Sequence, residues 1–454
     1  MNRRQFLSNT ARATLGATLF GAFRSGRLEA MDGSTPHVFW VQVHANGGWD
    51  QMLFCDPKFG PRQDQNGAFH SLDQLGQVAG IPYVDAYSLA APQIRPVGPF
   101  FQEFGERLTV ISGLDTSTNN HDVGTRYCMS GSLLEGFPIF AAQVAGVLGQ
   151  GKVMPLVDIS GYDEAGGLVA PVRLDYVGVP RITALQDTNK PSAGQWLNNT
   201  STVSADSLVH PDALASIRAA SRARLDRRQA AATLPARVRA LEAWRRAILA
   251  VPGLAELEIP SVGSNVLSNT KALASMGIKA FRAGHAMSMT VSAGGPNLDS
   301  HGISDADHLA ELTTVFEVAR HVANEADALE VPCIVVMSSD FGRTPVRETA
   351  GSGHWPIASM MLLQNSRAAA MDLLPRGVVI GGTTGPVEGP SSLTTVLNAR
   401  KIHPKTHAFD DTGVILTPSH VFKALRRVAG IAEADALRPF AIHVDGPELE
   451  LGGA

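Results

Sequence analysis

The sequence predicts an α/β fold built on a mostly parallel sheet. Several short runs are apolar throughout rather than alternating, which is typical of parallel strands buried on both faces. Helical stretches separate several of these runs, and the order strand, crossover helix, strand is that of a doubly wound sheet. The 454 residues, 44% of them hydrophobic and 18% charged, also provide enough apolar side chains for a large core.

The predicted strands are spread along the chain after residue 36. Each is rich in β-branched or other apolar residues, and turn-forming residues bound most of them. They cover residues 37–43 (HVFWVQV), 108–114 (LTVISGL), 155–160 (PLVDIS), 287–293 (MSMTVSA), 332–339 (PCIVVMSS), 358–364 (ASMMLLQ) and 376–382 (RGVVIGG).

Two helices are expected beside these strands. The clearer one begins after Ser304, an N-cap candidate with Asp307 three residues later, and carries apolar residues at helical spacing as far as Ala323. This helix is expected to cross the sheet between the strands at 287–293 and 332–339. The second helix covers residues 420–428.

Three other segments are predicted to lie outside the sheet. Residues 206–250 are rich in Arg and Ala and are broken near Pro235, which predicts a solvated helical insertion; binding of an anionic surface by its arginines is the alternative. Residues 57–85 and the Gly/Pro/Thr-rich segment 381–392 are predicted to be long surface loops.

The N-terminus has the features of an export signal. Residues 1–30 contain Arg3-Arg4 followed by Phe6-Leu7 and a mildly apolar run, which predicts a twin-arginine signal; an amphipathic helix is the alternative. We therefore expect a periplasmic or secreted protein that is exported folded, with one α/β domain at 36–445. No later run is long and apolar enough to span a bilayer.

Charge and cysteine content exclude several classes of protein. The net charge is -4, and the signal segment holds five arginines against one acid, so the remainder is more acidic and does not suit nucleic acid. The three cysteines, Cys55, Cys128 and Cys333, are too few and too widely spaced for a disulfide framework or a zinc ribbon. They are expected to be small apolar core residues.

Three of the predicted strands are each followed by an aspartate. Asp50 lies in GGWD, Asp299 in GGPNLDSH and Asp340 in SSDFGR. Ligands of open parallel sheets bind outside the carboxyl ends of the strands, so these acids are expected to converge on one edge. Three neighbouring carboxylates require cations. For Asp50, a plain turn residue is the alternative.

Histidines follow the strands in the same way. His301 is two residues from Asp299, His354 lies in GSGHW, and His121 lies in TNNHDVG. Imidazole with carboxylate suits zinc or manganese, whereas mostly oxygen ligands favour magnesium or calcium. We expect one or two divalent ions, bound by Asp50, His121, Asp299, His301, Asp340 and His354. A hydrogen-bonded structural histidine is the alternative for His354.

At these residues the sequence resembles the domain-of-unknown-function 1501 family, which is related to the alkaline phosphatase and sulfatase superfamily. The blocks GGWD, GGPNLDSHG, SSDFGRTP and GHW occur in that order behind a twin-arginine leader, so the resemblance covers nearly the whole mature chain. It implies a three-layer α/β/α sandwich with metals at the strand ends. Asp299 and His301 match the family's D-T-H-G, Asp340 matches the acid of S-E-F-G-R, and His354 matches the histidine of D-H.

Two departures from the family concern catalysis. Gly353 stands where the family has Asp before the last histidine, which removes one ligand of a two-metal centre. Asn120 stands where a nucleophilic hydroxyl is expected. Thr116, Ser117, Thr118 and Thr125 are the possible substitutes, and we take Thr118 as the candidate nucleophile.

The resulting hypothesis is an exported metal-dependent hydrolase of phosphate or sulfate esters. Thr118 or a metal-bound water would attack. Arg343 would bind the anion through its planar fork, unless Arg343 instead pairs with a nearby acid. The alternative is a non-catalytic periplasmic binding or assembly protein on the same fold. An α/β serine hydrolase is not expected because no Gly-x-Ser-x-Gly elbow occurs, and no Gly-x-Gly-x-x-Gly motif follows the first strand.

Overall fold

The computed structural model describes the chain in several stretches. These are residues 37–58, 75–84, 97–159, 161–174, 209–234, 263–293, 298–302, 305–347, 351–388 and 395–452, with a few single positions between 237 and 260. The expected export signal at 1–30 lies outside the described residues, as do the helix N-cap expected at Ser304 and much of the insertion expected at 206–250.

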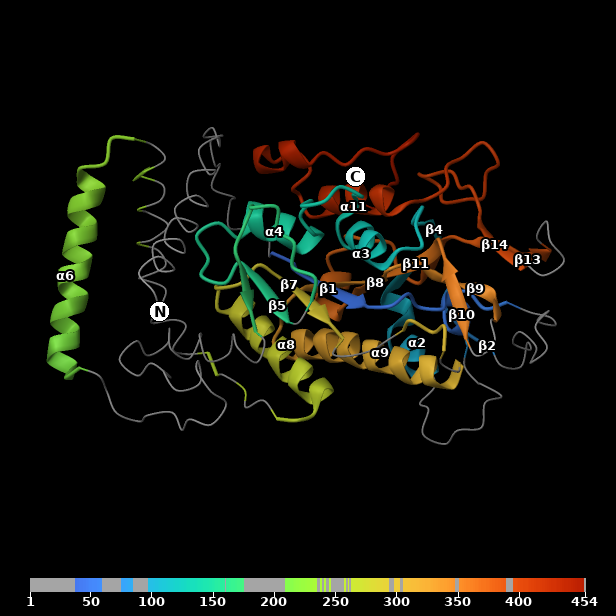
Figure 1. Cartoon of the computed structure of the whole chain (residues 1–454), viewed down its shortest axis with the longest axis horizontal. Helices are drawn as coiled ribbons and strands as arrows, with labels where there is room; N and C mark the ends of the chain where they lie inside the picture. Colours follow the sequence, from blue (N-terminus) through green and yellow to red (C-terminus); the bar gives the residue numbers. More distant parts are fainter. Residues whose placement is uncertain are drawn as a thin grey trace, which may run out of the picture. The chain divides into compact units, whose positions relative to one another are not determined.

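An eight-stranded sheet forms the centre of the larger of two compact units, which comprises residues 37–208 and 250–454 (Figure 1). In spatial order its strands are β12 (Val378–Gly381), β4 (Leu108–Asp115), β11 (Ile357–Gln364), β8 (Cys333–Ser339), β1 (Phe39–Ala45), β7 (Ser288–Ser292), β5 (Leu156–Ile159) and β6 (Pro171–Arg173). Each neighbouring pair is parallel except for the two pairs that β11 forms. The predicted α/β class is therefore confirmed.

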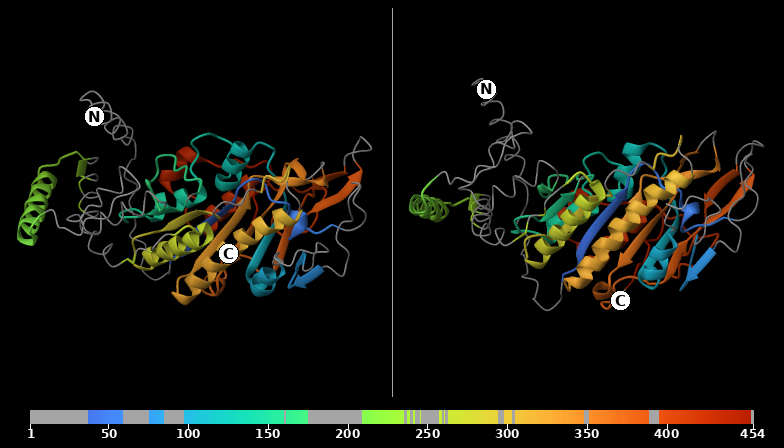
Figure 2. Two further views of the ribbon diagram at one scale, coloured as in Figure 1. Left: turned by 60° about the horizontal axis from the view of Figure 1, so that its bottom comes forward. Right: turned by 90° about the horizontal axis from the view of Figure 1, so that it is seen from below.

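Helices cover both faces of this sheet (Figure 2). One face carries α2 (Gly98–Phe104), α8 (Val266–Arg282) and α9 (Asp305–Ala328), and the other carries α3 (His121–Ser130), α4 (Phe140–Leu148) and α11 (Pro418–Val428). The short α10 (Ser366–Ala369) follows β11. The 3-10 helices are η1 (Gln51–Leu53), η3 (Gly105–Arg107) and η5 (Asp435–Phe440).

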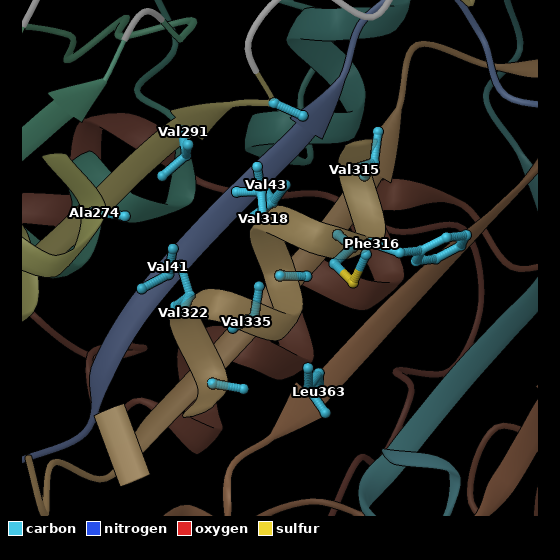
Figure 3. Packing of buried hydrophobic residues seen from close by; sticks show 14 of the residues in the cluster. Val41, Val43, Ala274, Val291, Val315, Phe316, Val318, Val322, Val335 and Leu363 are labelled. Atoms are coloured by element: carbon cyan, nitrogen blue, oxygen red, sulfur yellow. The ribbon is translucent and has the colours of Figure 1, made fainter. Parts of the chain in front are cut away.

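The core explains why the central strands are apolar at every position. All seven residues of β1 are buried, because α9 packs on one face and α4 on the other. In Figure 3, Val318 and Val322 of α9 lie over Val41 and Val43 of β1. As predicted, α9 crosses between β7 and β8, which flank β1 on either side.

Two segments predicted to be loops contain small antiparallel sheets. Within 57–85, β2 (Leu75–Val78) pairs with β3 (Ile81–Val84), and β13 (Thr383–Glu388), inside 381–392, pairs with β14 (Thr395–Ala399). Gly80 lies in the turn between β2 and β3, but Gly76, Pro82, Gly385 and Pro386 lie within the strands, so the Gly and Pro content concealed these short strands. A third pair, β9 (Gly342–Arg347) with β10 (Ser352–Trp355), follows β8.

Besides the helical residues Arg237, Val238, Leu241 and Arg245, the described part of the insertion contains α6 (Pro211–Ala230). It begins at the cap residue His210 with Pro211 in its first turn, and most of its side chains are exposed, although Leu225 is buried. Residues 209–249 belong to a different compact unit from residues 37–208 and 250–454. All elements other than α6 described above belong to the larger unit.

Two negative expectations concern cysteines and membranes. The three cysteines are buried and unpaired, as expected for core residues, and burial raises the pKa of each thiol. None of the helices in the described stretches is both long and apolar enough to cross a bilayer.

Candidate metal centre

The sheet topology gathers the predicted residues at one edge. Strands β1, β4, β7 and β8 all run in the same direction, so the segments that follow them leave the sheet at a common edge. The antiparallel strand β11 begins at that edge, where Ile357 pairs with Asp115 at the end of β4. A residue shortly before β11, such as His354, therefore joins residues that follow the parallel strands.

Three of the predicted metal ligands meet at this edge. His121 is the first residue of α3, Asp299 follows β7, and His354 lies on β10. Each offers one ligand atom, and these atoms lie within 4.8 Å of one another. The Nε2 atom of His354 is 3.2 Å from Asp299 Oδ1, and the Nε2 atom of His121 is 3.5 Å from Asp299 Oδ2. We call this group the His121–Asp299–His354 cluster.

The hydrogen bonds on the far side of each imidazole define which nitrogen faces the cluster. His121 Nδ1 is 2.7 Å from Asp340 Oδ2, and His354 Nδ1 is 2.8 Å from the carbonyl oxygen of Asn119. An ionised carboxylate and a carbonyl can only accept, so both Nδ1 atoms carry hydrogen. In a neutral imidazole, each Nε2 then directs a lone pair toward Asp299. Such a convergence requires either additional protons or a cation between the groups.

Asp340 lies behind the cluster as a buried acceptor. Its side chain has no exposed surface, and its Oδ1 accepts from His44 Nε2 at 2.7 Å and from Thr125 Oγ1 at 2.9 Å. Its Oδ2 accepts from His121 Nδ1 and from the backbone N–H of Gly47 at 2.9 Å. Asp340 was predicted to be a metal ligand. These contacts favour a role in orienting His121.

The charges in this region stabilise one another. The hydrogen bond to Asp340 raises the pKa of His121 above its usual 6.5, although burial acts to lower it. Burial acts to raise the pKa of Asp340, but hydrogen bonds from His121 and His44 outweigh it and hold that pKa well below 3.8. Burial likewise opposes the hydrogen bonds of Asp299 with Arg343 and His354, which hold its pKa below 3.8.

Arg343 fixes the loop that carries Asp299. The guanidinium is buried and donates to four backbone carbonyls and to Asp299 Oδ1, the last at 3.0 Å. The carbonyls belong to Gly47, Gly48, Leu298 and Ser352. With its donors directed at these groups, Arg343 is placed to position Asp299, whereas the sequence suggested direct binding of an ester. The structural pairing with an acid, which was the alternative, is present.

Two glycines allow the backbone to approach this closely. Gly47 has φ +109°, and a Cβ there would lie 2.5 Å from the backbone nitrogen of Asp299. In α3, a Cβ on Gly124 would lie 2.4 Å from the carbonyl oxygen of Asp340. The short contacts bring the β1 loop, the Asp299 loop and α3 together around Asp340.

Aromatic packing sets the planes of the two imidazoles. The Phe341 ring is buried, and its centroid lies 4.9 Å from that of His121 and 4.4 Å from that of His354. The ring of the third histidine, His301, lies 4.4 Å from that of His354 at a tilt of 49°, and its Nε2 is 3.6 Å from Asp299 Oδ1. His301 is about half exposed, so it borders the cluster on the solvent side.

Asp50 and Thr118 have other contacts. Asp50 is buried and caps η1, with Oδ1 accepting from Met52 N at 3.0 Å, and its backbone N–H donates to His308 Nε2 at 2.9 Å. This favours the turn role that was its alternative. The half-buried Thr118 accepts from Asn120 N through its hydroxyl at 3.1 Å. Of the four hydroxyl candidates, Thr125 is the one bonded to Asp340.

Sequence reasoning missed two contributors. His44 was not among the predicted site residues, yet it donates to Asp340 from near the end of β1. Phe341 was treated as part of a motif and not as a packing surface for the imidazoles. The available signal for His44 was its position near the end of the first predicted strand, just before the glycines; the pairing of β1 with β8, which brings it to Asp340, was not predicted.

Comparisons with known proteins give little beyond this geometry. No protein family model matches the chain, and no curated protein matches its sequence. Among solved structures, the chain is similar to Ps i-CgsB in complex with k-i-k-neocarrahexaose, at 8% identity and a TM-score of 0.39, over 86% of this chain and 72% of that chain. Another structure of Ps i-CgsB matches at 8% identity and a TM-score of 0.33, over 86% and 71%. Likenesses this weak carry no argument about activity.

Proposed function

We propose that this protein is an exported, alkaline-phosphatase-like hydrolase of phosphate or sulfate esters that uses a divalent ion at the His121–Asp299–His354 cluster. The observation that supports the proposal is the convergence of two imidazole nitrogens and a carboxylate at the carboxyl edge of a parallel sheet. Two Nε2 atoms can face one carboxylate only with protons on the imidazoles or with a cation between the groups, and the proposal takes the cation.

The donor set suits a borderline divalent cation such as zinc or manganese. One carboxylate and two imidazoles leave coordination positions open, which is typical of catalytic rather than structural sites. Magnesium and calcium, which prefer oxygen ligands, fit this set less well. A bound cation would supply Lewis-acid stabilisation of the negative charge that develops on the ester oxygens.

The surrounding residues would prepare the site for that role. Asp340 holds the proton of His121 on Nδ1 and so keeps Nε2 free to bind. Arg343 fixes the carboxylate of Asp299, and Phe341 fixes the planes of the rings. The half-exposed His301 faces the side from which an ester would enter, where it could transfer a proton to the leaving group.

Hydrolysis requires a nucleophile near the cluster, whereas the second candidate function, a non-catalytic binding or assembly protein, does not. Gly353 in place of an acid, and the bonding of the Thr118 hydroxyl to the neighbouring Asn120 N–H, both favour the second candidate. Thr125 favours the first, since its hydroxyl lies beside the cluster and is bonded to Asp340, the carboxylate that also holds His121.

A metal screen combined with generic esters tests the proposal. Chelator-treated protein would be loaded with zinc, manganese, magnesium or calcium and assayed with p-nitrophenyl phosphate and p-nitrophenyl sulfate. We expect turnover with zinc or manganese that disappears in Asp299→Asn and in His354→Ala but persists in the control His37→Ala, an exposed histidine at the start of the domain. Metal binding without turnover of either ester would support the binding protein. Absence of both metal binding and turnover would overturn the site.

A further inference from the structure

A second charged feature lies away from the candidate metal centre, on the face of the sheet covered by α4 and α11. Arg426, near the end of α11, is almost completely buried, with an exposed fraction of 5%. Its Nε donates to Gln143 Oε1 on α4 at 2.7 Å, and its guanidinium carbon lies 5.7 Å from the centre of the Phe137 ring. Among the described residues, no acceptor is within hydrogen-bond reach of its buried Nη2.

The lack of an acceptor is unusual because the neighbouring cations all have one. Lys423 Nζ lies 2.6 Å from Glu448, Arg427 donates to the same glutamate, and Arg438 lies 2.7 Å from Asp435. Arg426 has no such ion pair within the described stretches. Burial of an uncompensated charge is costly, so in native proteins such a charge is usually paired with a counter-ion.

Arg426 lines a cleft that could admit a counter-ion. The cleft has a volume of about 450 Å³ and is bounded by α11, by η5 and by the segments that flank η5. Its other charged walls are Lys423, Arg427 and Arg438 against Glu433 and Glu448, so positive charge is in excess when Arg426 is included. The exposed His443 stands at the same wall.

We propose that this cleft, which we call the Arg426 cleft, binds the phosphate or sulfate group of a small molecule. The Nε atom of Arg426 is committed to Gln143 and its Nη2 has no exposed surface, so Nη1 is the donor left to reach an oxyanion in the cleft, and the surplus of cations around it attracts the same charge. Burial lowers the pKa of Arg426 to about 10, which still leaves it charged at neutral pH. The inference does not depend on the metal centre.

Binding of inorganic phosphate tests the inference. Calorimetry and thermal unfolding would be followed against phosphate at constant ionic strength, with sulfate and acetate in parallel, in chelator-treated Asp299→Asn protein so that the metal centre does not contribute. We expect saturable binding of phosphate and sulfate, weaker binding of acetate, and a loss of roughly tenfold or more in phosphate affinity in Arg426→Met. Without phosphate, Arg426→Met removes an unpaired buried charge but also leaves Gln143 Oε1 without its donor, so these two effects oppose each other and its unfolding temperature should change by only a few degrees.

Two further variants make the outcome decisive. Arg367→Met removes an exposed arginine that pairs with Glu330, and it should bind phosphate as the parent does. Lys423→Gln changes a partly exposed wall of the cleft and should weaken binding several-fold, which tests the site if Arg426→Met does not fold. Absence of phosphate and sulfate binding in the parent, or unchanged affinity in both cleft variants, would overturn the inference.

Discussion

Replacing Asp340 with Asn perturbs the support of the metal centre without changing its shape. The carboxylate accepts from His44, His121, Thr125 and the backbone of Gly47, whereas an amide keeps one acceptor oxygen and presents a donor in place of the other. Both imidazoles therefore lose an ionised partner, and at least one of them also loses its acceptor, inside a buried network. Breaking such a buried pair costs about 3–5 kcal/mol.

The effect on stability should depend on pH. The depressed pKa of Asp340 contributes stability that is present above its ordinary value of 3.8 and is lost as the pH falls. The raised pKa of His121 contributes stability that is present below its ordinary value of 6.5 and is lost as the pH rises through the folded-state pKa. The stability difference between wild type and Asp340→Asn should therefore be largest between about pH 4 and 6.5.

Urea denaturation in chelator-containing buffer measures this difference, and NMR titration of His121 measures its pKa directly. Asp340→Asn should lower that pKa and weaken zinc binding about 10–100-fold. The control is Asp158→Asn, a buried carboxylate on β5 that bonds Gly161 N. It should lose stability but leave the pKa of His121 and the zinc affinity unchanged. If Asp340→Asn keeps wild-type stability, or leaves the pKa of His121 where it was, the orienting role is refuted.

Three further substitutions test separate contacts. Arg343→Lys should lower the free energy of unfolding by at least about 2 kcal/mol in urea denaturation, because an ammonium cannot donate to all the carbonyls that the guanidinium reaches. A change below about 0.5 kcal/mol would count against the role of Arg343 in fixing the Asp299 loop. Gly124→Ala should cost about 1–3 kcal/mol, because the new Cβ would meet the backbone of Asp340, whereas Gly263→Ala, which meets open space, should be close to neutral. Asp299→Asn should change the free energy of unfolding by less than about 1 kcal/mol, because this side chain is partly exposed. The same substitution should lower the zinc affinity measured by calorimetry at least about tenfold. An unchanged zinc affinity would show that Asp299 is not part of the site.

Much of the fold was predictable because its strands are buried on both faces. Continuous apolar runs predicted β1, β4, β5, β7, β8, β11 and β12, and the helical spacing after residue 304 predicted the crossover helix α9. The direction of β11 was not predictable, since an apolar run has the same composition in a parallel and an antiparallel strand. That direction matters for function, because it places His354 at the shared edge.

The sequence predicted which residues meet at the candidate site better than it predicted what each residue does there. Aspartates and histidines directly after strands were expected to converge, and His121, Asp299 and His354 do so. Whether Asp340 faces an ion or a histidine depends on distances of a few ångströms between loops far apart in sequence. The same is true of Arg343, whose carbonyl acceptors come from three separate segments.

Zinc titration of the chelator-treated protein tests the central claim most directly. Wild type should bind at least one zinc ion per chain and release protons as it does so, because the Nε2 atoms of His121 and His354 must be unprotonated to bind. The double variant Asp299→Ala with His354→Ala should bind none at that site while unfolding at a similar urea concentration. If wild type binds no zinc or manganese, or the double variant binds them equally, the cluster is not a metal centre and the proposed hydrolase mechanism is wrong.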